Sequence, residues 1–158
     1  MTTQPTPETL TELKFNDALR QTINQSYVPK DLPIFMAYVN EDGEPGASYR
    51  GSVVAVGDDK IGVWGRNGEG STMKAIASNA NVLLMYREPS PDHQRSLAVV
   101  TFRGKARVAT DEAERRQVYD TMPQRERDAD VEYKGVAIIV DLDSVSGFIP
   151  GYRLQMKR

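Results

Sequence analysis

The sequence of 158 residues contains no cysteine and only one histidine, His93. Without cysteine the chain can form no disulfide framework, no thiolate nucleophile and no cysteine metal site. One imidazole is too few for a multi-histidine metal site, and a histidine within Ser-Pro-Asp-His is more typical of a surface turn than of a metal or haem ligand. We therefore expect no bound metal, and any redox reaction would need a cofactor to carry the electrons.

Long hydrophobic runs and a large net charge are also missing. No apolar stretch approaches the roughly 20 residues that span a bilayer, and the first thirty residues are polar, without the pattern of a signal peptide. A net charge of −2 gives no strong field toward nucleic acid or an acidic membrane. We expect a single domain over residues 1–158, located in the cytoplasm, without nucleic-acid or membrane partners.

Apolar periodicity and turn residues divide the chain into mainly β elements. Thr6 and Pro7 are a helix-start signal, and apolar residues at roughly helical spacing predict an N-terminal helix over 6–25. Short helices are predicted over 71–79 and after Asp111. Strands are predicted over 33–39, 48–56, 60–66, 81–86, 95–108 and 135–147. Strands joined mainly by hairpins predict a six-stranded antiparallel Greek-key barrel with flanking helices, followed by a C-terminal tail over 148–158.

The glycine-rich segment GRNGEGSTMKA, residues 65–75, matches two nucleotide-binding loops only in part. The P-loop signature needs a lysine directly after its second glycine, where this sequence has Ser71. A dinucleotide fingerprint needs a third glycine, where this sequence has Met73.

Basic residues alternate at positions 103, 105 and 107, but the neighbouring Phe102 belongs to the opposite face of that strand, so a solvated face is favoured over a nucleic-acid site.

The order of short motifs from Pro33 to Gly147 resembles a known family. An RGS-containing strand, a hairpin, a strand ending in an aromatic, a small-residue loop and a lysine-bearing helix come first. An Asn-Ala pair, an apolar strand and a long strand with FRGKARV follow in sequence. This order is similar to the FMN-binding split barrel of the pyridoxamine 5′-phosphate oxidase-like superfamily, and the resemblance implies a split barrel over residues 33–147.

The resemblance also implies that FMN lies at the interface of a homodimer. Arg50 and Ser52, two apart on one strand, would face the cofactor. The ribityl chain and one ring edge would follow the strand end and the loop after it, and the phosphate would meet the start of the next helix. The resemblance implies Trp64, Gly65, Arg66 and Asn67 for the ribityl chain and the ring edge. It implies Ser71, Thr72 and Lys74 for the phosphate.

Elementary chemistry supports part of this assignment. A phosphate at a helix start meets free N–H groups and the positive end of the helix dipole, and Arg50 can add a bidentate contact. Two of these residues also have an alternative interpretation. Trp64 can be a core residue, and Lys74 can be a solvated lysine on the helix surface. Arg50 is hardest to assign otherwise, because a buried arginine needs an anionic partner.

Two departures from the family pattern limit what it implies. No basic residue stands at Ser71 or Thr72, where many relatives have one, and the tail GFIPGYRLQMKR lacks the arginine–histidine pattern that grips pyridoxamine phosphate. Oxidation of that vitamin is therefore not expected. Tyr152 and Arg153 in the tail are candidates to reach a substrate across the dimer.

The function that the resemblance implies is an FMN oxidoreductase that passes hydride or electrons from NADH or NADPH to a small acceptor, with no catalytic side chain identified. The alternatives are the same fold binding a deazaflavin or haem, and a flavin-binding module without turnover.

Overall fold

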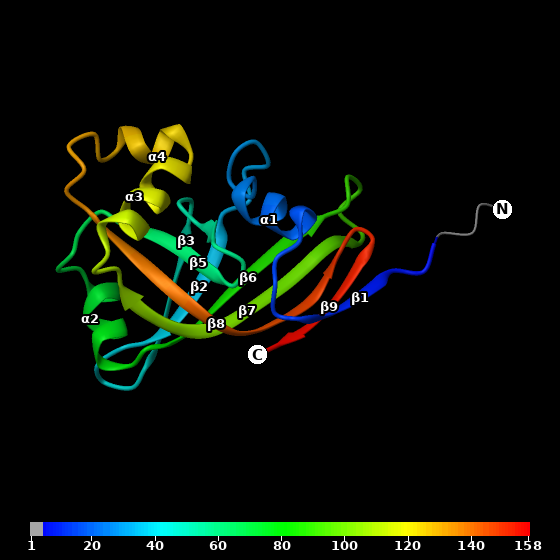
Figure 1. Ribbon diagram of the computed structural model, residues 1–158, viewed down its shortest axis with the longest axis horizontal. Coiled ribbons are helices and arrows are strands. Elements are labelled where there is room, and N and C mark those ends of the chain that lie inside the picture. Colours follow the sequence, from blue (N-terminus) through cyan, green and yellow to red (C-terminus); the bar gives the residue numbers. More distant parts are fainter. Residues whose placement is uncertain (1–4) are drawn as a thin grey trace.

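The computed structural model describes residues 5–158 and is mainly β, with nine strands and four helices in the described chain. Figure 1 shows the elements along a long, curved sheet. The strands are β1 (Glu8–Glu12), β2 (Ile34–Val39), β3 (Pro45–Arg50), β4 (Val54–Val56), β5 (Lys60–Gly65), β6 (Asn81–Pro89), β7 (Ser96–Val108), β8 (Val136–Ile149) and β9 (Tyr152–Lys157). The helices are α1 (Asp17–Asn24), α2 (Ser71–Ser78), α3 (Glu112–Thr121) and α4 (Gln124–Asp128).

The sheet closes only partly, because its longest strand has two different neighbours on one side. Residues 136–141 of β8 pair with β5, whereas residues 144–149 pair with β9, and β7 pairs with β8 along its other edge. The strand order is β1-β9-β8-β7-β6-β2-β3, with β4 attached through β5, and β1 runs parallel to β9. The sheet is therefore mixed and open. This arrangement confirms the predicted mainly β fold with flanking helices and corrects the strand count from six to nine.

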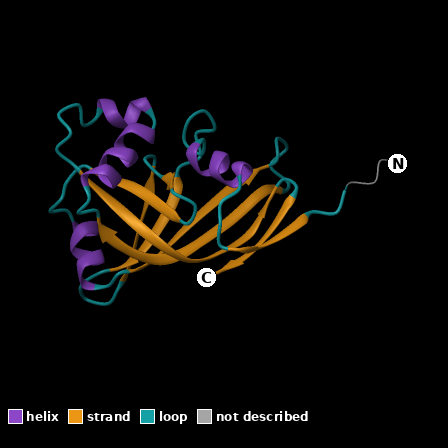
Figure 2. Cartoon of the chain, viewed as in Figure 1, coloured by secondary structure: helices purple, strands orange, loops and turns teal. Residues whose placement is uncertain are grey.

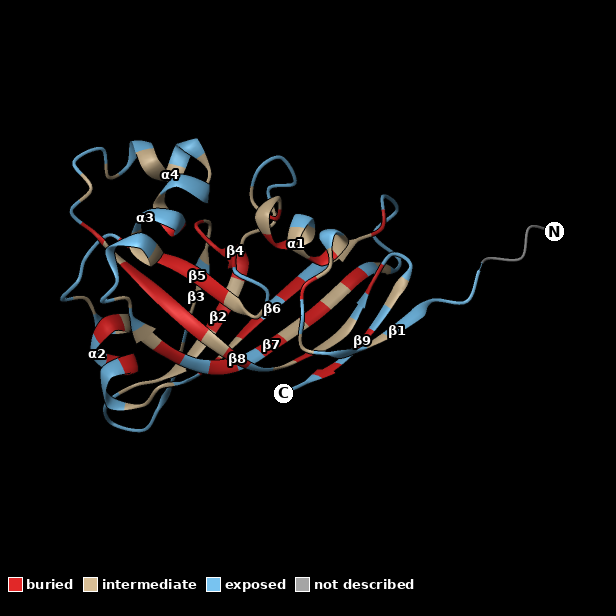
Figure 3. Cartoon of the chain, in the orientation of Figure 1, coloured by how far each residue is buried: buried red, intermediate tan, exposed pale blue. Residues whose placement is uncertain are grey.

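Two apolar clusters lie on opposite faces of the β5 region. Ile61 and Val63 face the main core inside the curved sheet, while Trp64 faces a second cluster in which Val118 of α3 covers the outer surface. Figure 2 shows α1, α3 and α4 on one side of the sheet and α2 at one end of it. Along β7 the predicted alternation is clear in the burial pattern of Figure 3, except that Val108, expected inside, is 40% exposed.

The predicted helix over 6–25 is wrong in its first half. Residues 8–12 form β1, which pairs with β9, and the helix begins only at Asp17. Asn16, rather than Thr6, caps it by accepting a hydrogen bond from the Leu19 amide. Leu10 packs against the main core from the strand, so pairing with a distant strand overrides the local helical spacing.

The predicted tail over 148–158 is also part of the sheet. β8 continues to Ile149, a turn with Gly151 at φ +83° reverses the chain, and β9 returns along β8. Leu154 and Met156 of β9 are buried in the main core. Residues 152–158 therefore help to build the core.

The predicted strand over 48–56 is interrupted. β3 ends at Arg50 and β4 begins at Val54, so Gly51, Ser52 and Val53 lie between two strands. The interruption lies beside Arg50, where residues 49–52 line a cavity. Within residues 5–158, no helix has both the length and the apolar surface needed to cross a membrane.

Candidate functional site

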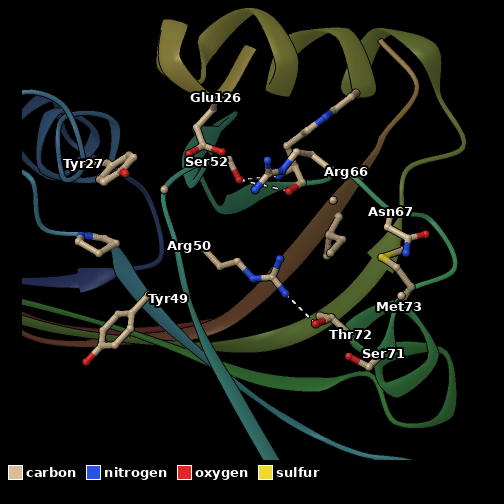
Figure 4. Close-up of a pocket in the computed structure, with 16 residues that line it drawn as sticks. Tyr27, Tyr49, Arg50, Ser52, Arg66, Asn67, Ser71, Thr72, Met73 and Glu126 are labelled. Carbon is tan, nitrogen blue, oxygen red and sulfur yellow. Dashed lines mark hydrogen bonds between the residues drawn. The ribbon is translucent and has the colours of Figure 1, made fainter. Parts of the chain in front are cut away.

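A cavity of about 450 Å³ lies between the β3–β4 interruption, the end of β5 and the start of α2. Eight of the nine cofactor-binding residues expected from the sequence line it: Arg50, Ser52, Trp64, Gly65, Arg66, Asn67, Ser71 and Thr72. The other lining residues are Tyr27, Pro33, Tyr49, Gly51, Gly70, Met73, Glu126 and Ile138. Segments far apart in the sequence therefore form one concave site (Figure 4).

Arg50 stands at the centre of this cavity. Its Nη2 donates a 2.7 Å hydrogen bond to Oγ1 of Thr72, whereas its buried Nε has no partner among the described residues. The pKa of Arg50 is lowered overall, and burial is the largest cause. Nearby Tyr38 raises the pKa, and the positive charge of Arg66 lowers it. Because an arginine stays protonated at neutral pH, the site presents a partly buried positive charge with an unused donor.

Helix α2 begins at the same cavity. Its N-cap is Gly70, which supplies no side-chain cap, so the first amides of the helix point away from any intrahelical acceptor. The hydroxyls of Ser71 and Thr72 lie at this helix start (Figure 4). Free amides and two hydroxyls lie at this helix start, and Arg50 and Arg66 line the same cavity, which is an arrangement suited to an anion such as a phosphate.

Ser52 and Trp64 line the cavity in a different way from the one expected. The Ser52 hydroxyl accepts a hydrogen bond from the Trp64 amide and donates to the Trp64 carbonyl, which ties β5 to the β3–β4 connection. The indole points to the outer cluster, where it stacks on Tyr133 and donates from Nε1 to Asp130 at 2.9 Å. The ring of Trp64 is therefore a core residue, and only its backbone belongs to the cavity wall.

Lys74 and His93 lie away from the cavity. Lys74 is exposed on α2 and borders a separate depression with Ser71, Asn40, Glu41 and Asp42. His93 has a φ of +61° in the exposed turn after β6, as expected for a surface residue. Tyr152 and Arg153 border another surface depression, beside Phe148. The structure thus brings together eight of the nine expected residues and leaves Lys74 outside.

Three aromatic or charged side chains of the cavity were not among the residues expected from the sequence. Tyr27 follows α1, Glu126 lies on α4, and Tyr49 precedes Arg50. Tyr49, which is exposed, forms an aromatic pair with the partly buried Phe35, with ring centroids 5.6 Å apart. No spacing rule links positions 27 and 126 to the strand at 50, because only the folded chain brings these segments together.

No family model matches this sequence, and no curated protein matches it. Several solved structures share its fold. A candidate 5-nitroimidazole antibiotic resistance protein from Bacteroides thetaiotaomicron is 20% identical, with a TM-score of 0.60 over 81% of this chain and 82% of that one. An FMN-binding protein from Syntrophomonas wolfei is 10% identical, with a TM-score of 0.60 over 83% and 84% of the two chains.

A candidate pyridoxamine 5′-phosphate oxidase from Lactobacillus delbrueckii is 17% identical, with a TM-score of 0.55 over 86% of this chain and 96% of that one. Other matching structures include a protein named an F420 reductase and a haem-binding protein from Mycobacterium smegmatis. Identities this low establish the fold alone. The chain has the fold of the pyridoxamine 5′-phosphate oxidase-like split barrel, within which flavin- and haem-binding proteins are found.

Proposed function

We propose that this protein is an FMN-binding oxidoreductase that works as a homodimer. The observation that carries the proposal is that the buried Nε of Arg50, in a cavity that the start of α2 also lines, has no hydrogen-bond partner among residues 5–158. A buried guanidinium donor without a partner is costly unless a ligand satisfies it. A phosphate group bound there would accept from Arg50 and from the helix amides at once.

The cavity offers distinct surfaces for the parts of FMN. Arg50, Arg66, Ser71 and Thr72 would hold the phosphate, because they supply two positive charges and two hydroxyl donors. Apolar contact for a flat ring is available from the other lining residues Pro33, Met73 and Ile138, and from the ring of Tyr49. Lys74 lies outside the cavity and is left out of this assignment.

The chemistry that FMN supplies when bound is transfer of hydride or electrons between a reduced nicotinamide and a small acceptor. The residues of the chain bind and orient, and no side chain needs to exchange a proton for that step. NADH or NADPH as the donor and a cytoplasmic location stay predictions from the sequence.

Solved structures with this fold include proteins named for two other cofactors, the deazaflavin F420 and haem. A deazaflavin also carries a phosphate-bearing arm, so the Arg50 end of the cavity suits it as well. Haem is less well supported, since the sole histidine lies in an exposed turn outside the cavity. We therefore place FMN first.

The homodimer is proposed from the outward face of the sheet beside the cavity. Tyr49 is 71% exposed, Met85 43% and Phe148 42%, and the strand register places Phe35 between Tyr49 and Met85. An exposed apolar sheet face of this kind is typical of an interaction surface. Because Tyr49 also lines the cavity, a second copy packed on this face would close the site.

The test is an absorption spectrum of the purified protein before and after addition of FMN and removal of the excess. A retained flavin band, followed by steady-state oxidation of NADH or NADPH, is the expected result. A protein that retains a deazaflavin or haem and rejects FMN would overturn the cofactor assignment. Retained FMN without any nicotinamide oxidation would favour a flavin-binding module over an enzyme.

A further inference from the structure

The end of the cavity away from α2 has an acidic and an aromatic side chain in its wall, Glu126 and Tyr27. Gly51 lies between the ring of Tyr27 and the carboxylate of Glu126: a Cβ at this position would be 2.5 Å from Tyr27 Cδ2 and 2.7 Å from Glu126 Oε1. Glycine therefore allows both side chains to pack directly on the backbone of the β3–β4 connection. Figure 4 shows Glu126 on one side of Arg50, and Thr72 and Ser71 on the other.

The side chain of Glu126 lines the cavity from α4 (Figure 4). It takes part in none of the ion pairs of residues 5–158, and the neighbouring arginines of α4 bond elsewhere. Arg125 lies over the ring of Tyr27, 4.2 Å from its centroid, and pairs with Asp31 at 4.0 Å. Arg127 donates to the Asp120 carbonyl at 3.0 Å. A half-buried carboxylate thus faces the cavity as an acceptor, beside an aromatic ring that a cation–π contact holds in place.

We propose that the wall formed by Tyr27, Gly51 and Glu126 is the subsite for the molecule that exchanges hydride or electrons with the cofactor. This subsite would take a small planar molecule with a positively charged or N–H donor group. The ring of Tyr27 provides a flat apolar contact. The carboxylate of Glu126 accepts from a donor and repels a carboxylate or phosphate. The proposal rests on the proposed function for its use of the Arg50 end by FMN, and it adds the class of molecule that the other end selects.

Benzamidine and benzoate are suitable probes, because they have the same ring and nearly the same shape but opposite charge. Binding of each is measured by NMR titration of the full chain, following the Gly51 amide, with and without FMN. In the unaltered protein benzamidine should bind about 3- to 10-fold more tightly than benzoate. Glu126→Gln should abolish this preference, whereas the control Asp128→Asn, an exposed charge on the same helix, should preserve it.

Two outcomes would overturn the proposal: equal affinity of both probes for the unaltered protein, or an unchanged preference in Glu126→Gln. Titration of the same proteins with FMN separates this failure from that of the proposed function. If FMN is not retained but benzamidine still requires Glu126, the cofactor assignment fails and the subsite stands. If FMN binds and the probes do not discriminate, the subsite fails alone. Tyr27→Ala should weaken both probes and so report the aromatic contact separately.

Discussion

Nη2 of Arg50 and Oγ1 of Thr72 lie 2.7 Å apart and join the last residue of β3 to the first turn of α2. The two residues are 22 positions apart in the sequence, and the hydrogen bond sets the guanidinium across the cavity floor. The hydroxyl supplies only one acceptor, so most of the donors of Arg50 stay available to a ligand. These free donors are what the proposed phosphate would need.

The first prediction concerns this arginine. Arg50→Ala should weaken FMN binding by about 2–3 kcal/mol, because it removes charge-assisted hydrogen bonds to the phosphate. Fluorescence titration of FMN measures the change. Arg95→Ala, an exposed arginine outside the cavity, is the matched control and should leave the affinity unchanged. Equal affinities for Arg50→Ala and the unaltered protein would remove Arg50 from the binding site.

A second prediction follows from the close packing at Gly51. Gly51→Ala should destabilise the protein by about 1–3 kcal/mol, because the added methyl group overlaps the Tyr27 ring and the Glu126 carboxylate. Denaturant unfolding measures the loss. At Gly68 a Cβ would meet its nearest neighbour, Val136, at an ordinary 3.5 Å, so Gly68→Ala serves as the control. A Gly51→Ala protein as stable as this control would show that Tyr27 and Glu126 are free to move away.

The third prediction is a pH dependence at Asp130. Burial raises the pKa of this carboxyl, but hydrogen bonds from the amides of Lys134 and Gly135 and from the Trp64 indole outweigh it, and the net pKa is lowered. A lowered pKa contributes stability that is fully present above the ordinary aspartate value of about 3.9 and is lost as pH falls through the folded-state value.

Asp130→Asn should therefore cost about 1–2 kcal/mol near neutral pH, and this cost should shrink as the pH falls below about 3.9. The free energy of unfolding can be followed by fluorescence, since Trp64 is the sole tryptophan and bonds directly to Asp130. Asp128→Asn should show no such convergence with the unaltered protein at low pH. A difference for Asp130→Asn that does not change with pH would argue against an ionised partner for the indole.

A fourth prediction tests the outward sheet face. Met85→Glu should convert the proposed dimer to a monomer, because it places a charge in the middle of the apolar surface. Light scattering should change from about twice 17.6 kDa to 17.6 kDa. Val131→Glu is the control, because Val131 is 78% exposed and lies on the connection between α4 and β8. An unaltered protein that is already monomeric with bound flavin would contradict the dimer.

The sequence alone determined the class of fold and indicated most of the expected residues that line the cavity around Arg50. Apolar and polar residues alternate along residues 95–108, and this local pattern predicts β7. Turn residues between the strands are also a local signal, and they predict its neighbours. The resemblance of the motif order to a known family implied nine site residues, and the cavity brings eight of them together. The lack of cysteine and the single histidine limited the chemistry before any fold was known.

Only the tertiary structure decided the features that depend on distant pairing. β1 forms because residues 8–12 find an edge on β9, although their local spacing is compatible with a helix. Trp64 faces outward because α3 and Asp130 cover that side of β5, which no pattern in residues 60–66 reveals. Tyr27 and Glu126 meet at Gly51 through contacts between segments separated by many residues. Periodicity reports which side of a strand is apolar, whereas the partner that covers this side is set by packing across the whole chain.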